Sequence, residues 1–254
     1  MDDAFANSSS EDHEVLARLY MTLANAWMSV GDRVVANELF MYSRHHALEC
    51  GDQATIDALM YNKAAFALAW LRARTCLDER DPELLRQLRL ELASAKTYQQ
   101  MVGVSALNNF VYLWEARLHL LADEFEAAIA ALHAVRSMQP FARYNFHESL
   151  VDLEIGYCLV RQGHFSLAAT QVSSAMDVDL GGLHDDDKLV AAWTRLKILE
   201  AVPELGDARS ASDTLNVLRN EFVASCEDLR VALNGLGSHA HITKPMVIHP
   251  KAVR

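Results

Sequence analysis

Histidine and aspartate side chains, which commonly bind metal ions or transfer protons, gather at three places: 45–46, 184–187 and 235–254. The pair at 45–46 falls late in a predicted helix, where adjacent side chains point about 100° apart, whereas two ligands of one metal favour a wider spacing. The His-Asp-Asp-Asp run at 184–187 is typical of a helix start, where carboxylates meet the positive end of the helix dipole. In the last segment no cysteine or acid accompanies the histidines, which are His239, His241 and His249. We therefore expect no metal site.

Known catalytic motifs do not occur in the sequence. It contains no G-x-x-x-x-G-K phosphate loop, no G-x-G-x-x-G turn after a strand, no H-E-x-x-H and no G-x-S-x-G. The carboxylates are plentiful, but they fall on the polar faces of patterned helices, where solvated acids are common. The sequence thus predicts a protein that is not an enzyme and has no cofactor. A helical enzyme or accessory subunit without a recognisable motif is the remaining alternative.

A basic cluster surrounds the predicted loop 76–82 and could receive an acidic partner or a phosphate. Its members are Arg72, Arg74, Arg80, Arg86 and Arg89. The alternative is pairing with neighbouring acids such as Asp78, Glu79 and Glu83, and exposed pairs of this kind contribute little to stability. We treat the basic cluster as a secondary candidate binding surface.

The composition indicates an all-α protein. Of the 254 residues, 51% are hydrophobic, only 10 are glycine and 5 are proline, and helix-forming alanine and leucine dominate. The formal net charge of −11 repels phosphate backbones, so we expect no nucleic-acid partner. The four cysteines form no C-x-x-C pair, as expected of reduced, buried thiols. The acidic N-terminal residues do not fit a signal peptide and the apolar runs are too short for a bilayer, so we expect a cytoplasmic location and no membrane partner.

Start and stop signals divide the chain into ten predicted helices. Gly-Asp at 31–32 and at 51–52 supplies a helix stop followed by an N-cap, and Asp-Pro-Glu at 81–83 starts another helix. Short loops force antiparallel neighbours, so we expect about five helical hairpins in one domain at 12–234, after a flexible leader at 1–11 and before an extended or disordered tail at 235–254. The predicted helices span 12–30, 33–49, 53–75, 82–101, 104–122, 125–138, 146–162, 165–177, 187–201 and 208–233.

A pattern of large and small residues recurs along the chain. In LEIGYCLVRQGHFSLAATQVSSAM, residues 153–176, Gly163 separates two amphipathic helices, and the small residues Gly156 and Ala168 let their backbones approach closely. The segment LADEFEAAIAALHAVRSMQP and the region 17–49 follow the same order. This pattern resembles the tetratricopeptide repeat (TPR) family, in a long-period variant. Elsewhere the hairpins follow from periodicity alone.

The resemblance to TPR proteins implies a right-handed superhelical array of hairpins, an α-solenoid whose first helices line a concave groove. Aromatic rings together with asparagine and arginine suit recognition of a peptide in such a groove. Mapping the first helices onto the TPR pattern places nine side chains there: Arg18, Asn25, Tyr61, Asn62, Trp114, Arg117, Glu154, Tyr157 and Arg161.

Two functions remain open at this point. The first is a scaffold or adaptor that binds a partner protein or peptide in the groove. The alternative is a regulatory sensor subunit that binds a small molecule or short peptide and controls an effector on another chain. The helix at 208–233 either caps the array or forms a homodimer seam, through Leu215, Leu218, Phe222, Leu229 and Leu233.

Overall fold

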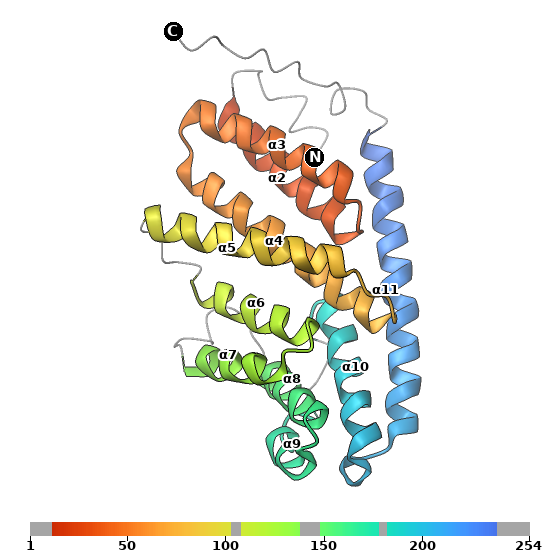
Figure 1. The fold of residues 1–254 in the computed structure, drawn as a ribbon. Coiled ribbons are helices and arrows are strands. Elements are labelled where there is room, and N and C mark those ends of the chain that lie inside the picture. Colours follow the sequence, from red (N-terminus) through yellow and green to blue (C-terminus); the bar gives the residue numbers. More distant parts are fainter. Residues whose placement is uncertain (1–11, 103–107, 138–147, 178–181, 238–254) are drawn as a thin grey trace.

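The computed structural model describes residues 12–102, 108–137, 148–177 and 182–237, and within these ranges it contains helices and no strands (Figure 1). The prediction of an all-α fold is therefore confirmed. The helices are α2 (His13–Ser29), α3 (Arg33–Cys50), α4 (Gln53–Cys76), α5 (Pro82–Val102), α6 (Asn108–Leu121), α7 (Phe125–Ser137), α8 (Glu148–Arg161), α9 (Phe165–Val172), α10 (Asp185–Ala201), the short 3-10 helix η2 (Pro203–Leu205) and α11 (Ala208–Gly237).

Aspartate caps begin the early helices where the sequence places them. The side chains of Asp12, Asp32 and Asp52 accept hydrogen bonds from backbone N–H groups three residues later, at 3.3, 3.1 and 3.0 Å. Each bond satisfies a backbone donor that the first turn of a helix leaves unpaired. Gly51 ends α3 in the left-handed region at φ 70°, as predicted for a helix stop.

Two helix ends differ from their predictions. Helix α9 ends at Val172, short of residue 177, and the chain continues in turns. Helix α11 continues past residue 233 to Gly237, because Leu233 is buried against the first helices and Leu236 packs beside it. Part of the predicted tail is therefore helical. The rest of the tail and the leader lie outside the described residues.

The α8–α9 hairpin shows the close approach that its small residues predict. A Cβ atom added at Gly156 would lie 2.1 Å from Cγ1 of Val172, far inside van der Waals contact. Ala168 is fully buried in the same interface. Gly163 forms the turn with φ 79°. The absence of a side chain at Gly156 thus sets the distance between the two helices.

The helices are arranged as hairpins stacked side by side, with the last hairpin folded across the others (Figure 1). Helix α10 contacts both α8 and α4, although α4 precedes it by more than a hundred residues. Helix α11 runs along α10 and reaches α2. The α10–α11 hairpin therefore covers the side of the array on which α4, α6 and α8 meet.

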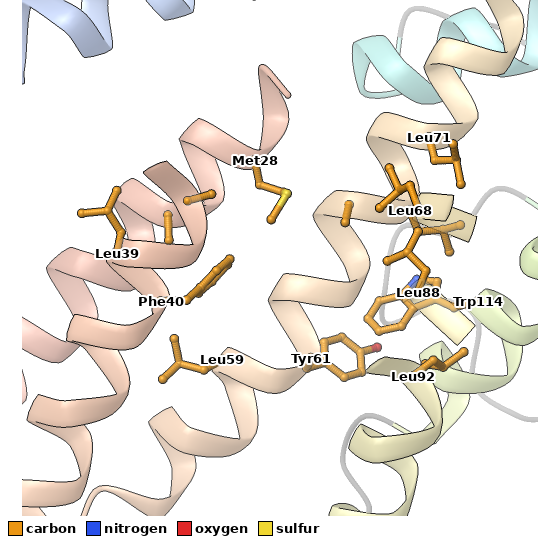
Figure 2. Close-up of a cluster of buried hydrophobic side chains, with 14 of the residues drawn as sticks. Met28, Leu39, Phe40, Leu59, Tyr61, Leu68, Leu71, Leu88, Leu92 and Trp114 are labelled. Atoms are coloured by element: carbon orange, nitrogen blue, oxygen red, sulfur yellow. The ribbon is translucent and has the colours of Figure 1, made fainter. Parts of the chain in front are cut away.

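Apolar packing joins helices that are distant in sequence. The largest buried cluster spans α2 to α6, and Figure 2 shows its members Met28, Phe40, Leu88 and Trp114. A second cluster joins α4, α10 and α11 through residues such as Cys76, which packs with the side chains of the last two helices. Burying this apolar surface is the main force that holds the final hairpin in place.

Two arginines of α11 bind the C-terminal ends of earlier helices. Arg219 Nε donates to the carbonyl of Cys76, at the end of α4, at 2.8 Å. Arg230 Nη2 donates to the carbonyl of Val30, at the end of α2, also at 2.8 Å. Carbonyl groups at a helix C-terminus lack partners within the helix and carry partial negative charge, so both bonds are charge-assisted.

The residues predicted for a homodimer seam pack mainly within the chain. Leu215, Phe222 and Leu233 are buried against α4, α10 and α2. On the outer face, Val217, Val223 and Val231 are exposed, and Leu229 of the predicted seam is 37% exposed. In the described structure this helix therefore covers the array, and dimerisation through 208–233 stays a prediction.

Candidate functional site

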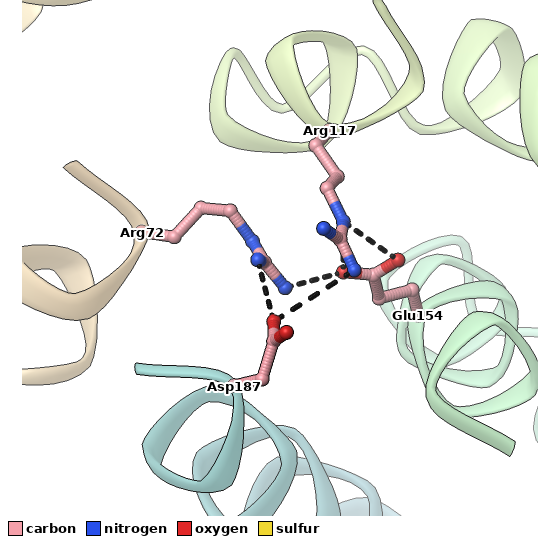
Figure 3. A network of polar contacts seen from close by, with 4 residues as sticks. All are labelled: Arg72, Arg117, Glu154 and Asp187. Atoms are coloured by element: carbon pink, nitrogen blue, oxygen red, sulfur yellow. Dashed lines mark hydrogen bonds and ion pairs between the residues drawn. The ribbon is translucent and has the colours of Figure 1, made fainter. Parts of the chain in front are cut away.

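Four charged side chains from four helices meet in the interior of the molecule. Arg72 lies on α4, Arg117 on α6, Glu154 on α8 and Asp187 in the first turn of α10 (Figure 3). Glu154 is 2% exposed and the arginines are 5% and 7% exposed. We call these four residues the charge network. Burying a charge is costly unless it is paired, so their mutual contacts decide whether the network is tolerated.

Glu154 occupies the centre of the charge network. Its Oε1 accepts hydrogen bonds from Arg72 Nη2 at 2.8 Å and from Arg117 Nε at 3.0 Å. Arg72 Nη1 donates to Oδ1 of Asp187 at 2.9 Å, and Arg117 Nη2 lies 3.9 Å from the same oxygen. Two positive and two negative charges therefore balance. Through Asp187, the network also ties the last hairpin to the helices it covers.

The field of the charge network favours the charged forms of Arg72 and Asp187. Burial alone would lower the pKa of Arg72, but Glu154 and Asp187 outweigh it and raise that pKa. Burial alone would raise the pKa of Asp187, but the two guanidinium groups outweigh it and hold that pKa below its usual value.

Asp186 shows the opposite shift. Burial and the charge of Asp187 raise its pKa, and the two arginines offset this only in part. Within the described residues Asp186 takes part in no ion pair. Asp186 is therefore an acid whose charge has no direct partner.

A cavity of about 710 Å³ lies beside the charge network, enclosed by α4, α6, the start of α10 and α11. Arg72, Arg117 and Asp187 line it on one side. Elsewhere its walls are largely aromatic, and we call it the aromatic cavity. The rings come from three helices: Tyr61, Phe66, Trp70, Phe110, Trp114 and Phe222. Its volume lies within the range of small-molecule binding sites, roughly 300–1,000 Å³.

The aromatic cavity has a buried floor and an exposed mouth. Tyr61 and Trp114 are buried, with ring centroids 4.0 Å apart, and form part of the floor (Figure 2). Asp185, Ser225 and Leu229 also line the cavity and are exposed to solvent. The mouth therefore lies between the start of α10 and the outer part of α11.

A smaller cavity of about 230 Å³ lies on the other side of the charge network. Arg72, Arg117 and Glu154 line it together with Tyr157 and Trp193. The Trp193 indole N–H is buried and has no hydrogen-bond partner among the described residues. At this volume the cavity falls below the usual range for a drug-sized ligand.

The nine residues predicted for an open groove lie in different surroundings, and Tyr157 lines the smaller cavity. Asn25 and Asn62 are half-buried. Arg18 forms an ion pair with Glu14, and Arg161 donates a hydrogen bond to Tyr157. Tyr61 and Trp114 line the aromatic cavity, and Arg117 joins Glu154 in the charge network. Five side chains are 7% exposed or less and so cannot contact a peptide on an open surface: Tyr61, Trp114, Arg117, Glu154 and Tyr157. Tyr61 packs on Trp114, and Arg117 binds Glu154. Trp193 of α10 packs on Tyr157.

The basic cluster is not a group of free cations. Arg72 is buried in the charge network and so belongs to no surface patch. Arg74 pairs with Glu79, Arg80 with Asp123, Arg86 with Glu83 and Arg89 with Glu124. The alternative of local acid pairing therefore describes Arg74 and Arg86, whereas Arg80 and Arg89 reach acids at the turn after α6.

Sequence reasoning missed several residues of the aromatic cavity, among them Trp70, Asp186 and Phe222. Trp70 and Phe222 lie on apolar helix faces, which one sequence does not distinguish from ordinary core. The 184–187 run does lie at the start of α10 as predicted, but His184 makes no capping hydrogen bond through its side chain. Its aspartates also line the aromatic cavity, a role that needs knowledge of which helix lies opposite.

The part of the chain that the structure describes offers neither a metal site nor a membrane-spanning helix. Among the described residues no group of three or more His, Cys, Asp or Glu side chains is placed to hold a metal ion. None of the described helices combines the length and apolarity needed to span a bilayer. Comparison with protein-family models, curated proteins and solved structures finds no match for the chain.

Proposed function

We propose that this protein is a cytoplasmic, non-catalytic regulatory sensor subunit with a TPR-like, right-handed superhelical array. In this proposal the aromatic cavity binds a small molecule or short peptide, and the occupied protein changes its contact with an effector on another chain. The observation that carries the proposal is the 710 Å³ aromatic cavity closed by α11. A preformed, largely apolar space with a few convergent polar groups is typical of a ligand site.

The geometry favours this function over an adaptor with an open groove. An extended peptide lying along α4, α6 and α8 would have to displace the α10–α11 hairpin. That displacement would expose a buried apolar cluster and separate Asp187 from Arg72. A ligand that enters the aromatic cavity through its mouth requires neither change. The adaptor therefore stays the second hypothesis.

The reactive side chains support a non-catalytic role. Burial raises the pKa of the Cys76 and Cys158 thiols to about 12, so neither is a thiolate nucleophile near neutral pH. Glu154 and Asp187 are bound to guanidinium groups. All four cysteines are free, which supports a reducing, cytoplasmic location.

Helix α11 connects the aromatic cavity to the outer surface. Phe222 lines the cavity from α11, while Val217, Val223 and Val231 on the same helix are exposed. A ligand pressing on Phe222 would shift a helix whose opposite face is free to meet an effector. Ligand and effector would then be coupled through one element, as allostery requires.

The test is a thermal-shift screen of small metabolites against three forms of the full chain. Ala69 lines the aromatic cavity, and Ala54 lies exposed in the first turn of the same helix. Ala69→Leu reduces the cavity volume, and Ala54→Leu is the matched control. A ligand at a hundred times its Kd stabilises by about 2.7 kcal/mol, which raises the Tm by roughly 5–11 °C.

The proposal requires this shift in the wild type and in Ala54→Leu, and its loss in Ala69→Leu. Far-UV circular dichroism of each variant checks that it folds, and Ala65→Leu, at a second lining position, replaces Ala69→Leu if that variant does not. Equal shifts in all forms, or no shift with any compound, would refute the proposed use of this cavity.

A further inference from the structure

We propose that the ligand of the aromatic cavity is an organic cation, an ammonium group attached to an aromatic or apolar body. This inference rests on the proposed function and adds the chemical class of the ligand. It follows from three features of the cavity: its rings, the charges that line it and the position of Asp186.

The rings of the aromatic cavity form a surface suited to a flat apolar body and to a cation. Tyr61 makes an edge contact with Phe110 at 5.8 Å between centroids, and Trp70 lies 6.3 Å from Phe222. Aromatic faces attract ammonium and guanidinium groups within about 6 Å. Arg74 already lies 5.4 Å from the Trp70 ring centroid, which shows that this ring can accept a cation.

The arginines that line the aromatic cavity already face carboxylates of the protein. Arg72 uses its two terminal nitrogens on Asp187 and Glu154. Arg117 donates to Glu154 and faces Asp187. An anionic ligand would therefore have to displace a carboxylate from Arg72. At Arg117 it would meet Asp187 and the other aspartates of α10.

The acids near the aromatic cavity outnumber the bases. Three aspartates and two arginines line it, and Glu154, which binds both arginines, lies directly behind them. Asp185 pairs with Lys188 at 3.0 Å, which leaves Asp186 as the acid without a direct ion pair among the described residues. Burial raises the pKa of Asp186, as expected of a carboxyl group that lacks a compensating cation. A ligand ammonium group beside Asp186 would supply that compensation.

Three probes that share one indole body test this inference by isothermal titration calorimetry on the full chain. They are tryptamine, a cation, 3-methylindole, which is neutral, and 3-indolepropionate, an anion. We expect tryptamine to bind at least about tenfold more tightly than the other two, because only its ammonium group makes a charge-assisted contact with Asp186.

The matched variants are Asp186→Asn, which keeps the side-chain shape, and Asp228→Asn, at an exposed position on α11. We expect Asp186→Asn to weaken tryptamine binding at least about tenfold and to leave 3-methylindole unchanged. Asp228→Asn should bind all three probes as the wild type does. Tryptamine binding that is equal in wild type and Asp186→Asn would overturn the assignment of Asp186.

The same titrations separate failure of this inference from failure of the proposed function. Binding of the neutral or anionic probe that equals or exceeds that of tryptamine, and is lost in Ala69→Leu, would overturn the cationic ligand and leave the cavity as a binding site. Absence of binding by all three probes at millimolar concentration would overturn the inference that the cavity accepts an aromatic ammonium compound and would count against the cavity as a site.

Discussion

Replacing Glu154 by glutamine should destabilise the protein far more than any exposed charge replacement. The carboxylate of Glu154 accepts hydrogen bonds from Arg72 at 2.8 Å and from Arg117 at 3.0 Å, and it is 2% exposed. Glutamine keeps the shape and one acceptor oxygen but removes the negative charge. Two buried guanidinium groups would then share Asp187 alone.

The expected loss can be estimated from the geometry. Removing one partner of a buried ion pair costs about 3–5 kcal/mol. Asp187 stays in place, 2.9 Å from Arg72, so the lower end of this range applies. For a domain of this size, a loss of about 3 kcal/mol lowers the Tm by roughly 6–12 °C.

Urea denaturation and thermal melting, both followed by circular dichroism at pH 7, measure this loss. Glu200→Gln is the control, because Glu200 pairs with Lys197 at 2.8 Å on the surface and should contribute below about 1 kcal/mol. The double variant Arg72→Met/Glu154→Gln restores the charge balance, so it should be less destabilised than the sum of its single variants. Two results would refute this account of the charge network. One is a loss of stability in Glu154→Gln no larger than that in Glu200→Gln, and the other is a loss in the double variant equal to the sum of its single variants.

Three further predictions concern packing, the attachment of α11 and pH. Gly156→Ala should destabilise the protein by about 1–3 kcal/mol in urea denaturation, because the new Cβ meets the buried Val172. This loss should outweigh the better helix propensity of alanine. Adding Val172→Ala in the same chain should recover part of the loss. Arg219→Met with Arg230→Met should speed hydrogen exchange of α11 amides at least about tenfold, whereas the exposed Arg209→Met should leave it unchanged. Burial, together with His13 and His45, lowers the pKa of His46 from 6.5 to about 4, and Glu49 opposes this shift. The His46 side chain therefore binds a proton more tightly in the unfolded chain than in the folded protein. The contribution of neutral His46 to the free energy of unfolding is therefore complete above pH 6.5 and is lost as the pH falls towards 4. Relative to His46→Gln, the wild type should lose on the order of 3 kcal/mol over this range. The exposed His164→Gln variant should follow the wild type.

Local structure was predictable because local residues determine it. Asp32 and Asp52 cap the helices that follow them, and Gly51 ends α3, because capping depends on a few neighbouring backbone groups. The small residue at Gly156 likewise indicates a close helix–helix approach within one hairpin. The all-α class and the helix order follow from signals of this kind.

The site could be predicted only in part, because it depends on contacts between distant segments. The TPR pattern predicts Arg117 and Glu154 in an open groove, whereas in the structure the two side chains are buried and hydrogen-bond to each other. The sequence does not show that α10 returns to α4, so it predicts a surface position for Arg72 and a helix start for Asp187. Helical periodicity identifies the buried face of α11 but not the helices that it covers.

The most direct test of the central claim is native mass spectrometry of the full chain, purified under mild conditions from the cells that produce it. The account predicts one small molecule bound per chain in the wild type and in Ala54→Leu, and a bare chain for Ala69→Leu. Identical masses for all three forms, or a stoichiometric polypeptide partner in place of a small molecule, would contradict the claim that the aromatic cavity is the functional site.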